Sequence, residues 1–186
     1  TLPSNTLPIQ AYDNSVENLI AAIKPVIFDS TLYAKRVNQN ENIDLVKNSA
    51  NNYYEGVTEA EVDQFYNSKK EPNDPMPISW GLNSKLMKEN GNLVEKTWKI
   101  GGMYNDAIQK IVYWLEKASK VAENEDQQRV INSLIDYYET GDLLTFDEYS
   151  ILWVKDLDSR IDFINGFIET YGDPLGLKAS WESVVN

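Results

Sequence analysis

The sequence predicts an α+β fold that is predominantly helical with at least one β-hairpin. Apolar residues recur at the three- and four-residue spacing of an amphipathic helix over several long stretches, most clearly from Asp106 to Ala122. Around Asn90 and Gly91, apolar and polar residues instead alternate, as in two strands joined by a tight turn. The length of 186 residues, without internal repeats, predicts a single domain spanning residues 1–186.

The N-terminal third predicts an extended arm followed by three helices. Two prolines and no periodicity indicate the arm, and Asp13 or Ser15 is a helix-start residue. Thr58 and Glu61 form a capping box, in which each side chain bonds a free backbone N–H at a helix start. The expected segments are an arm over 1–11 and helices over 15–28, 43–54 and 59–69.

The remaining elements are expected to be a hairpin and three further helices. Gly141 is typical of a residue that ends a helix, and three prolines between 72 and 77 indicate a loop before the hairpin. The expected hairpin strands cover 82–88 and 93–99, and the expected helices cover 106–122, 126–140 and 146–153.

The net charge of −12 comes from 29 acidic and 17 basic residues. Such a field repels phosphate backbones and anionic membrane surfaces, so neither nucleic acid nor a membrane is an expected partner. A ligand with a positive charge, such as a peptide with a free amino end, is attracted. The alternative is that the acidic surface serves solubility alone.

The chain contains no histidine and no cysteine. This composition excludes disulfides, a cysteine nucleophile, imidazole-dependent triads and the common zinc sites within the sequence itself. No cofactor is therefore expected on this chain. The lack of thiols fits a cytoplasmic or a periplasmic protein and leaves the compartment undecided.

An acidic run at Asp156, Asp158 and Asp162 suggests a calcium loop at first sight. It lacks the glycine and the bidentate glutamate of an EF-hand, so a solvated, salt-bridged face near Arg160 is the favoured interpretation.

Residues 161–181 are the most informative for function. This segment fits a helix with one apolar stripe, or a strand in which Phe167, Glu169 and Tyr171 share a face. Apolar walls around Glu169 and a nearby phenol suit the binding of an ammonium group. On spacing alone, the favoured interpretation is that Glu169 is an ordinary surface carboxylate and Tyr171 a core or turn aromatic.

Residues 167–176, read as F-I-E-T-Y-G-D-P-L-G, resemble the F-I-E-x-Y-x-D-P-x-G signature of the dipeptidyl peptidase III family. Residues 52–54, 82–88 and 111–118 have counterparts in that family in the same order. The resemblance covers about residues 50–186.

The resemblance implies a zinc-dependent exopeptidase that removes dipeptides from peptide N-termini, in a cleft between a zinc-bearing helical lobe and a lobe with a β-core. This chain would be part of the β-core lobe. The glutamate matched by Glu169 would hold the substrate amino group, with Phe167 beside it. The tyrosine matched by Tyr171 would stabilise the oxyanion at the scissile carbonyl. If Glu169 and Tyr171 face one ligand, their spacing predicts a strand over 166–171.

Two departures from the family pattern have consequences. The zinc motif His-Glu-x-x-Gly-His is absent, so the resemblance implies a non-catalytic fragment whose zinc lobe lies beyond Asn186 in a longer chain. Gly172 stands where some relatives carry an arginine. A lobe without its partner exposes an apolar patch, which predicts self-association.

Two other functions remain open at this point. One is a free-standing peptide- or glycan-binding module on the same scaffold. The other is an interaction domain without a small ligand, indicated only by the acidic surface and the helical content.

Overall fold

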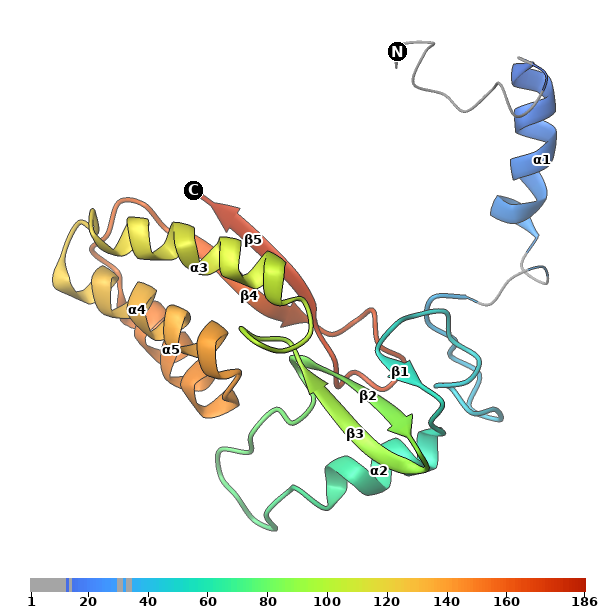
Figure 1. The fold of residues 1–186 in the computed structure, drawn as a ribbon, viewed down its shortest axis with the longest axis horizontal. Helices are drawn as coiled ribbons and strands as arrows, with labels where there is room; N and C mark the ends of the chain where they lie inside the picture. Colours follow the sequence, from blue (N-terminus) through green and yellow to red (C-terminus); the bar gives the residue numbers. More distant parts are fainter. Residues whose placement is uncertain (1–12, 14, 30–31, 33–34) are drawn as a thin grey trace.

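The computed structural model describes Asp13, residues 15–29, Leu32 and residues 35–186 (Figure 1). It has five helices and five strands in an α+β arrangement, as the sequence predicts. The extended arm expected over 1–11 lies outside the described residues. Within the described part of the chain, no helix combines the length and the apolar character needed to cross a membrane.

The first helix, α1 (Val16–Phe28), begins where the sequence predicts and continues past Pro25. The Ser15 side chain caps it by accepting from the backbone N–H of Asn18 at 3.1 Å. No residue of α1 is buried, and Figure 1 shows the helix apart from the other elements. Most of its apolar residues are therefore exposed, which the helical spacing alone does not reveal.

A three-stranded sheet and one helix follow. Strand β1 (Tyr54–Glu55) pairs parallel with β2 (Ser84–Glu89), which pairs antiparallel with β3 (Asn92–Thr97). Asn90 and Gly91 both have positive φ, as a tight two-residue hairpin turn requires, so the predicted hairpin is confirmed. Helix α2 (Glu59–Asn67) begins with the predicted capping box of Thr58 and Glu61.

Three consecutive helices form the next layer, namely α3 (Asn105–Ser119), α4 (Glu125–Thr140) and α5 (Leu143–Lys155). Helix α4 packs against both α3 and α5. All three are predicted from the sequence, but α4 is capped by Asn124 rather than opened by Asp126. Gly141 ends α4 in the left-handed conformation, as expected.

A two-stranded antiparallel sheet of β4 (Phe163–Glu169) and β5 (Ser180–Val185) completes the fold. Helix α3 runs along this sheet (Figure 1). The main core lies between the helices and the strands, where Trp98, Tyr138 and Phe167 are buried together. A smaller core joins α2 to the three-stranded sheet through residues such as Val62, Tyr66 and Leu86.

The helix expected over 43–54 is wrong. Residues 41–50 form turns, and Asn and Asp side chains bond the local backbone there. The Asn38 and Asn40 side chains accept from the N–H groups of Asn40 and Asn42. Such bonds compete with helix formation, which explains why the apolar spacing misleads in this segment.

Candidate functional site

Glu169 is the last residue of β4, and the strand ends two residues before Tyr171. The strand predicted over 166–171 is thus present as far as Glu169, whereas Tyr171 begins the turn that leads to β5. Glu169 is half-buried, and no donor in the described part of the chain bonds its carboxylate. The carboxylate is free to accept from a ligand.

A β-bulge between Phe167 and Glu169 changes which face each side chain occupies. Phe167 pairs with Trp181, and Glu169 pairs with Ser180. Cross-strand partners project to the same face, and consecutive residues on β5 project to opposite faces. Phe167 and Glu169 therefore face opposite sides of the sheet, in contrast to the unbroken alternation that the sequence suggests.

Phe167 belongs to the buried face. Its ring lies 4.9 Å from that of Trp98 and 6.3 Å from that of Tyr138, between ring centroids. Phe167 also lines a pocket of about 730 Å³ together with Tyr53, Trp98 and Tyr104. Phe167 therefore connects the candidate site with an aromatic pocket behind the sheet.

Tyr171 belongs to the opposite, open face. Its side chain is 68% exposed, and its hydroxyl donates a hydrogen bond of 3.4 Å to Oε1 of Glu182. Glu182 lies two residues after Ser180, the partner of Glu169, and thus projects to the same face as Glu169. The structure therefore places two carboxylates and one phenol on this face. We call Glu169, Tyr171 and Glu182 the acidic site.

Sequence reasoning finds Glu169 and Tyr171 but misses Glu182. The alternation of Trp181, Glu182 and Ser183 is the signal that could have found it, because it predicts a strand with Glu182 on one face. Two carboxylates and a hydroxyl suit a group with several N–H donors, above all an ammonium ion.

The turn that carries Tyr171 is held at its far end by Asp173. This buried carboxylate accepts from the Tyr54 hydroxyl at 2.8 Å and from the backbone N–H groups of Leu175, Leu177 and Lys178 at 2.8–3.2 Å. Charge-assisted hydrogen bonds of this kind fix both the turn and its distance from β1. The Asp-Pro-x-Gly part of the signature thus has a structural role beside the site.

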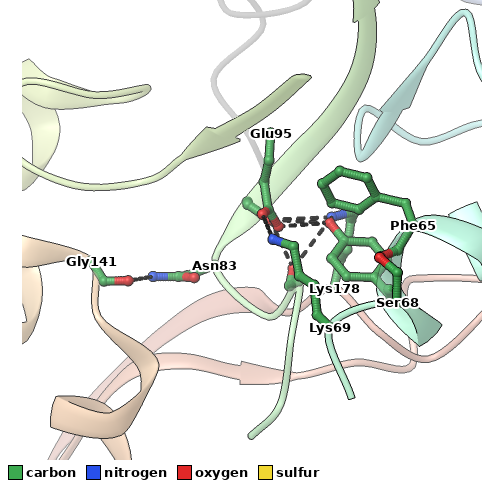
Figure 2. Close-up of polar contacts among 10 residues, drawn as sticks. Phe65, Ser68, Lys69, Asn83, Glu95, Gly141 and Lys178 are labelled. Carbon is green, nitrogen blue, oxygen red and sulfur yellow. Dashed lines mark hydrogen bonds and ion pairs between the residues drawn. The ribbon is translucent and has the colours of Figure 1, made fainter. Parts of the chain in front are cut away.

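Lys178 holds the same turn against the three-stranded sheet (Figure 2). Its side chain is fully buried, and Nζ donates to the Tyr66 hydroxyl at 2.7 Å and to Ser84 Oγ and the Gly81 carbonyl at 3.3 Å each. Burial lowers the pKa of Lys178 to about 8, against the opposing effect of the Glu95 and Asp173 charges.

Glu95 completes this buried group from the hairpin. It accepts from Tyr66 at 2.8 Å, from Ser84 at 2.7 Å and from Lys69 at 2.5 Å. Burial raises the pKa of Glu95, but the three hydrogen bonds outweigh burial and hold that pKa below its usual value. The turn beside the acidic site is therefore attached to α2 and to the hairpin by a connected polar network.

Gly172 is buried beneath the guanidinium of Arg36. A Cβ atom at Gly172 would lie 2.6 Å from Arg36 Nη2, so a larger residue here would require the guanidinium to move. Arg36 and Gly172 are thus in direct contact although they lie far apart in the sequence, and sequence reasoning misses Arg36.

An apolar groove of about 400 Å³ lies between α3 and the β4–β5 sheet. Trp114 and Val121 line it and are 68% and 80% exposed, respectively. We call this surface the α3 groove. Its apolar character distinguishes it from the acidic site on the other face of the sheet.

A metal centre is not present in the described part of the chain, where no three His, Cys, Asp or Glu side chains gather closely enough to hold an ion. The residues present therefore do not fit a zinc site.

Comparisons with known proteins agree with the fold described above. Two solved structures, of dipeptidyl-peptidase III from a Corallococcus strain and of DPP III from Caldithrix abyssi, share the fold with a TM-score of 0.56. Each is 20% identical in sequence and covers 72% of this chain, whereas this chain covers 24% of each. The curated dipeptidyl peptidase 3 of Dictyostelium discoideum is 32% identical over 85 residues, and that of Mus musculus is 31% identical over 106.

These alignments span 46% and 56% of this chain but only 12% and 14% of the two relatives. Fold and sequence together define a protein of the peptidase class. The profile of Peptidase family M49 matches residues 28–186, so the chain belongs to that family. The match begins at the last residue of α1, which leaves most of that helix outside it.

Proposed function

We propose that this chain is the substrate-binding portion of a dipeptidyl peptidase III-like zinc exopeptidase, which releases dipeptides from peptide N-termini. The observation that carries the proposal is the acidic site, where Glu169, Tyr171 and Glu182 share one open face of the sheet. Membership of a peptidase family supports a peptide as the substrate.

Glu169 has the role of holding the free amino group of the peptide. Its carboxylate has no donor of its own in the described part of the chain, so a bound ammonium replaces only water. Glu182 projects to the same face and adds a second acceptor. An ammonium held by two carboxylates gains charge-assisted hydrogen bonds that an acylated amine cannot make.

Tyr171 has the role of donating a hydrogen bond to the scissile carbonyl oxygen as negative charge develops there. Its present bond to Glu182 is long, at 3.4 Å, and its side chain is exposed, so the hydroxyl can turn to a substrate at little cost. Phe167 faces the opposite side of the sheet, so its part in substrate binding is to hold β4 in place by packing against Trp98.

The chain is non-catalytic by itself in this proposal. The zinc ligands and the groups that activate water belong to the remaining part of a longer protein, whose zinc-bearing lobe packs against this one. The α3 groove is an apolar surface suited to such packing. A free-standing peptide- or glycan-binding module has no specific observation in its favour.

The test is the hydrolysis of a dipeptidyl-arylamide by the full-length gene product, compared with the same compound acetylated at its amino end. The proposal expects cleavage of the free amine and a loss of at least roughly a hundredfold in kcat/KM on acetylation. The isolated 186-residue chain should cleave neither compound. Equal cleavage of both compounds, or an inert full-length protein, would overturn the proposal.

A further inference from the structure

The guanidinium group of Arg36 packs against the backbone of Gly172, the residue directly after Tyr171. A Cβ atom at Gly172 would lie 2.6 Å from Nη2, 3.2 Å from Cζ and 3.3 Å from Nε of Arg36. Three atoms at such distances show that the planar group covers this position. Gly172 is not among the glycines with positive φ, so the feature of this position is the close approach of Arg36 rather than the backbone conformation.

The charge of Arg36 is not neutralised within the described part of the chain. No carboxylate there forms an ion pair with it, although the whole sequence carries 29 acidic residues. The side chain is exposed, so a ligand can reach it. The guanidinium is held against Gly172 and has no carboxylate partner in the described residues, so it is available for an anion.

Tyr53 lies close to the same guanidinium. Burial raises the pKa of Tyr53, and hydrogen bonding to Arg36 opposes that rise. Tyr53 also lines the aromatic pocket together with Phe167. Arg36 therefore lies where the turn that carries Tyr171 meets the residues of that pocket.

We propose that Arg36 is a specificity-determining residue that binds a carboxylate side chain of the peptide, next to the scissile bond. The proposal rests on the proposed function, because it takes Tyr171 as the group that contacts the scissile carbonyl. Glu169 and Glu182 attract the ammonium end of the peptide, and Arg36 attracts an acidic side chain one or two residues further along. A guanidinium binds a carboxylate through two parallel hydrogen bonds, which an amide of the same shape cannot match.

The experiment uses the full-length gene product and pairs of peptides that differ only by Asp against Asn at the second or third position. Binding is measured by calorimetry on protein depleted of metal with a chelator, and kcat/KM is measured on the metal-loaded protein. The wild-type protein should prefer one of the Asp peptides by roughly tenfold in both measurements.

The variants separate the charge of Arg36 from its place in the fold. Arg36→Gln should bring the Asp-to-Asn ratio close to one, while the matched control Lys35→Gln, which removes an exposed charge one residue away, should leave the ratio as in wild type. In the double variant Arg36→Gln with Gly172→Arg, the new side chain enters the vacated space and should restore the preference.

A wild-type ratio near one in both measurements, or an unchanged ratio in Arg36→Gln, would overturn the proposal for Arg36. The full-length protein could also bind the Asp peptide preferentially but cleave no peptide, with the preference lost in Arg36→Gln. This result would contradict the proposed peptidase function and support Arg36 as the residue that binds the carboxylate. The two failures are therefore distinguishable.

Discussion

The ammonium of Lys178 donates a hydrogen bond of 2.7 Å to the hydroxyl of Tyr66, inside the protein and 112 residues away along the chain. Tyr66 in turn donates to Glu95 on the hairpin. These two hydrogen bonds attach the turn beside the acidic site to α2 and to the three-stranded sheet. The position of the turn that carries Tyr171 therefore depends on residues of other elements, far away along the chain.

Lys178 makes the stability of the protein depend on pH. Its pKa is about 8 in the folded protein and 10.5 ordinarily, so the unfolded chain binds more protons between these values and stability rises with pH there. Relative to Lys178→Met, the wild-type free energy of unfolding should gain about 2 kcal/mol from pH 7 to pH 9.5. Urea unfolding at several pH values measures the difference, and parallel curves for the two proteins would refute the assignment.

Asp173 should be the most sensitive carboxylate near the site. In Asp173→Asn, an NH₂ group replaces one carboxylate oxygen. This group would face donors that bond an oxygen in the wild-type protein, including the Tyr54 hydroxyl. We expect a loss of about 2–4 kcal/mol in the free energy of unfolding. Asp158→Asn, at an exposed position, is the control and should change stability by less than about 0.5 kcal/mol. Equal effects of the two changes would contradict the buried network.

Gly81 and Gly91 form a matched pair for testing the packing around Tyr66. Both have positive φ, but a Cβ atom at Gly81 would lie 2.8 Å from the Tyr66 ring, whereas nothing lies within 4 Å of one at Gly91. Gly91→Ala should cost only the backbone strain, about 1–2 kcal/mol. Gly81→Ala should cost roughly 1–3 kcal/mol more, because the ring of Tyr66 must move. Thermal unfolding of both variants measures the two losses of stability. A smaller loss for Gly81→Ala than for Gly91→Ala would exclude close packing around Gly81.

The α3 groove predicts that the isolated 186-residue chain associates with itself. Trp114 lines the groove and is largely exposed, so Trp114→Gln should weaken association by roughly tenfold or more. Leu157, exposed but outside the groove, provides the control Leu157→Gln. Sedimentation equilibrium gives the dissociation constants. A wild-type chain that stays monomeric at high concentration would refute the prediction.

Most of the fold could be predicted from the sequence, because most of its elements depend on local chemistry. The capping box at Thr58 and the Asn90-Gly91 turn each depend on a few adjacent residues, so the sequence specifies them directly. The prediction over 43–54 failed because Asn side chains bond the local backbone next to this segment, and because α2 adds bonds that no local pattern contains. There the Leu45 N–H donates to Glu59, and the Glu59 N–H donates to Asp44.

The site was predictable only in part for the same reason. The signature proposed Glu169 and Tyr171 as candidates, whereas Glu182 comes to the same face through the register of β5, which a single strand does not reveal. The burial of Lys178 contradicts the usual exposure of lysine and arises from partners on α2 and the hairpin. Arg36 meets Gly172 across 136 positions, a contact that no local pattern contains.

The most direct test of the peptidase role is the steady-state kinetics of Tyr171→Phe in the full-length gene product, with zinc content measured on the same samples. The change removes one hydroxyl from an exposed side chain. Kinetics should therefore show kcat falling by roughly a hundredfold, with KM and zinc content close to wild type, since the hydroxyl acts on charge that develops in the transition state. An unchanged kcat with intact zinc would contradict the central claim that this face of the sheet contacts the scissile bond.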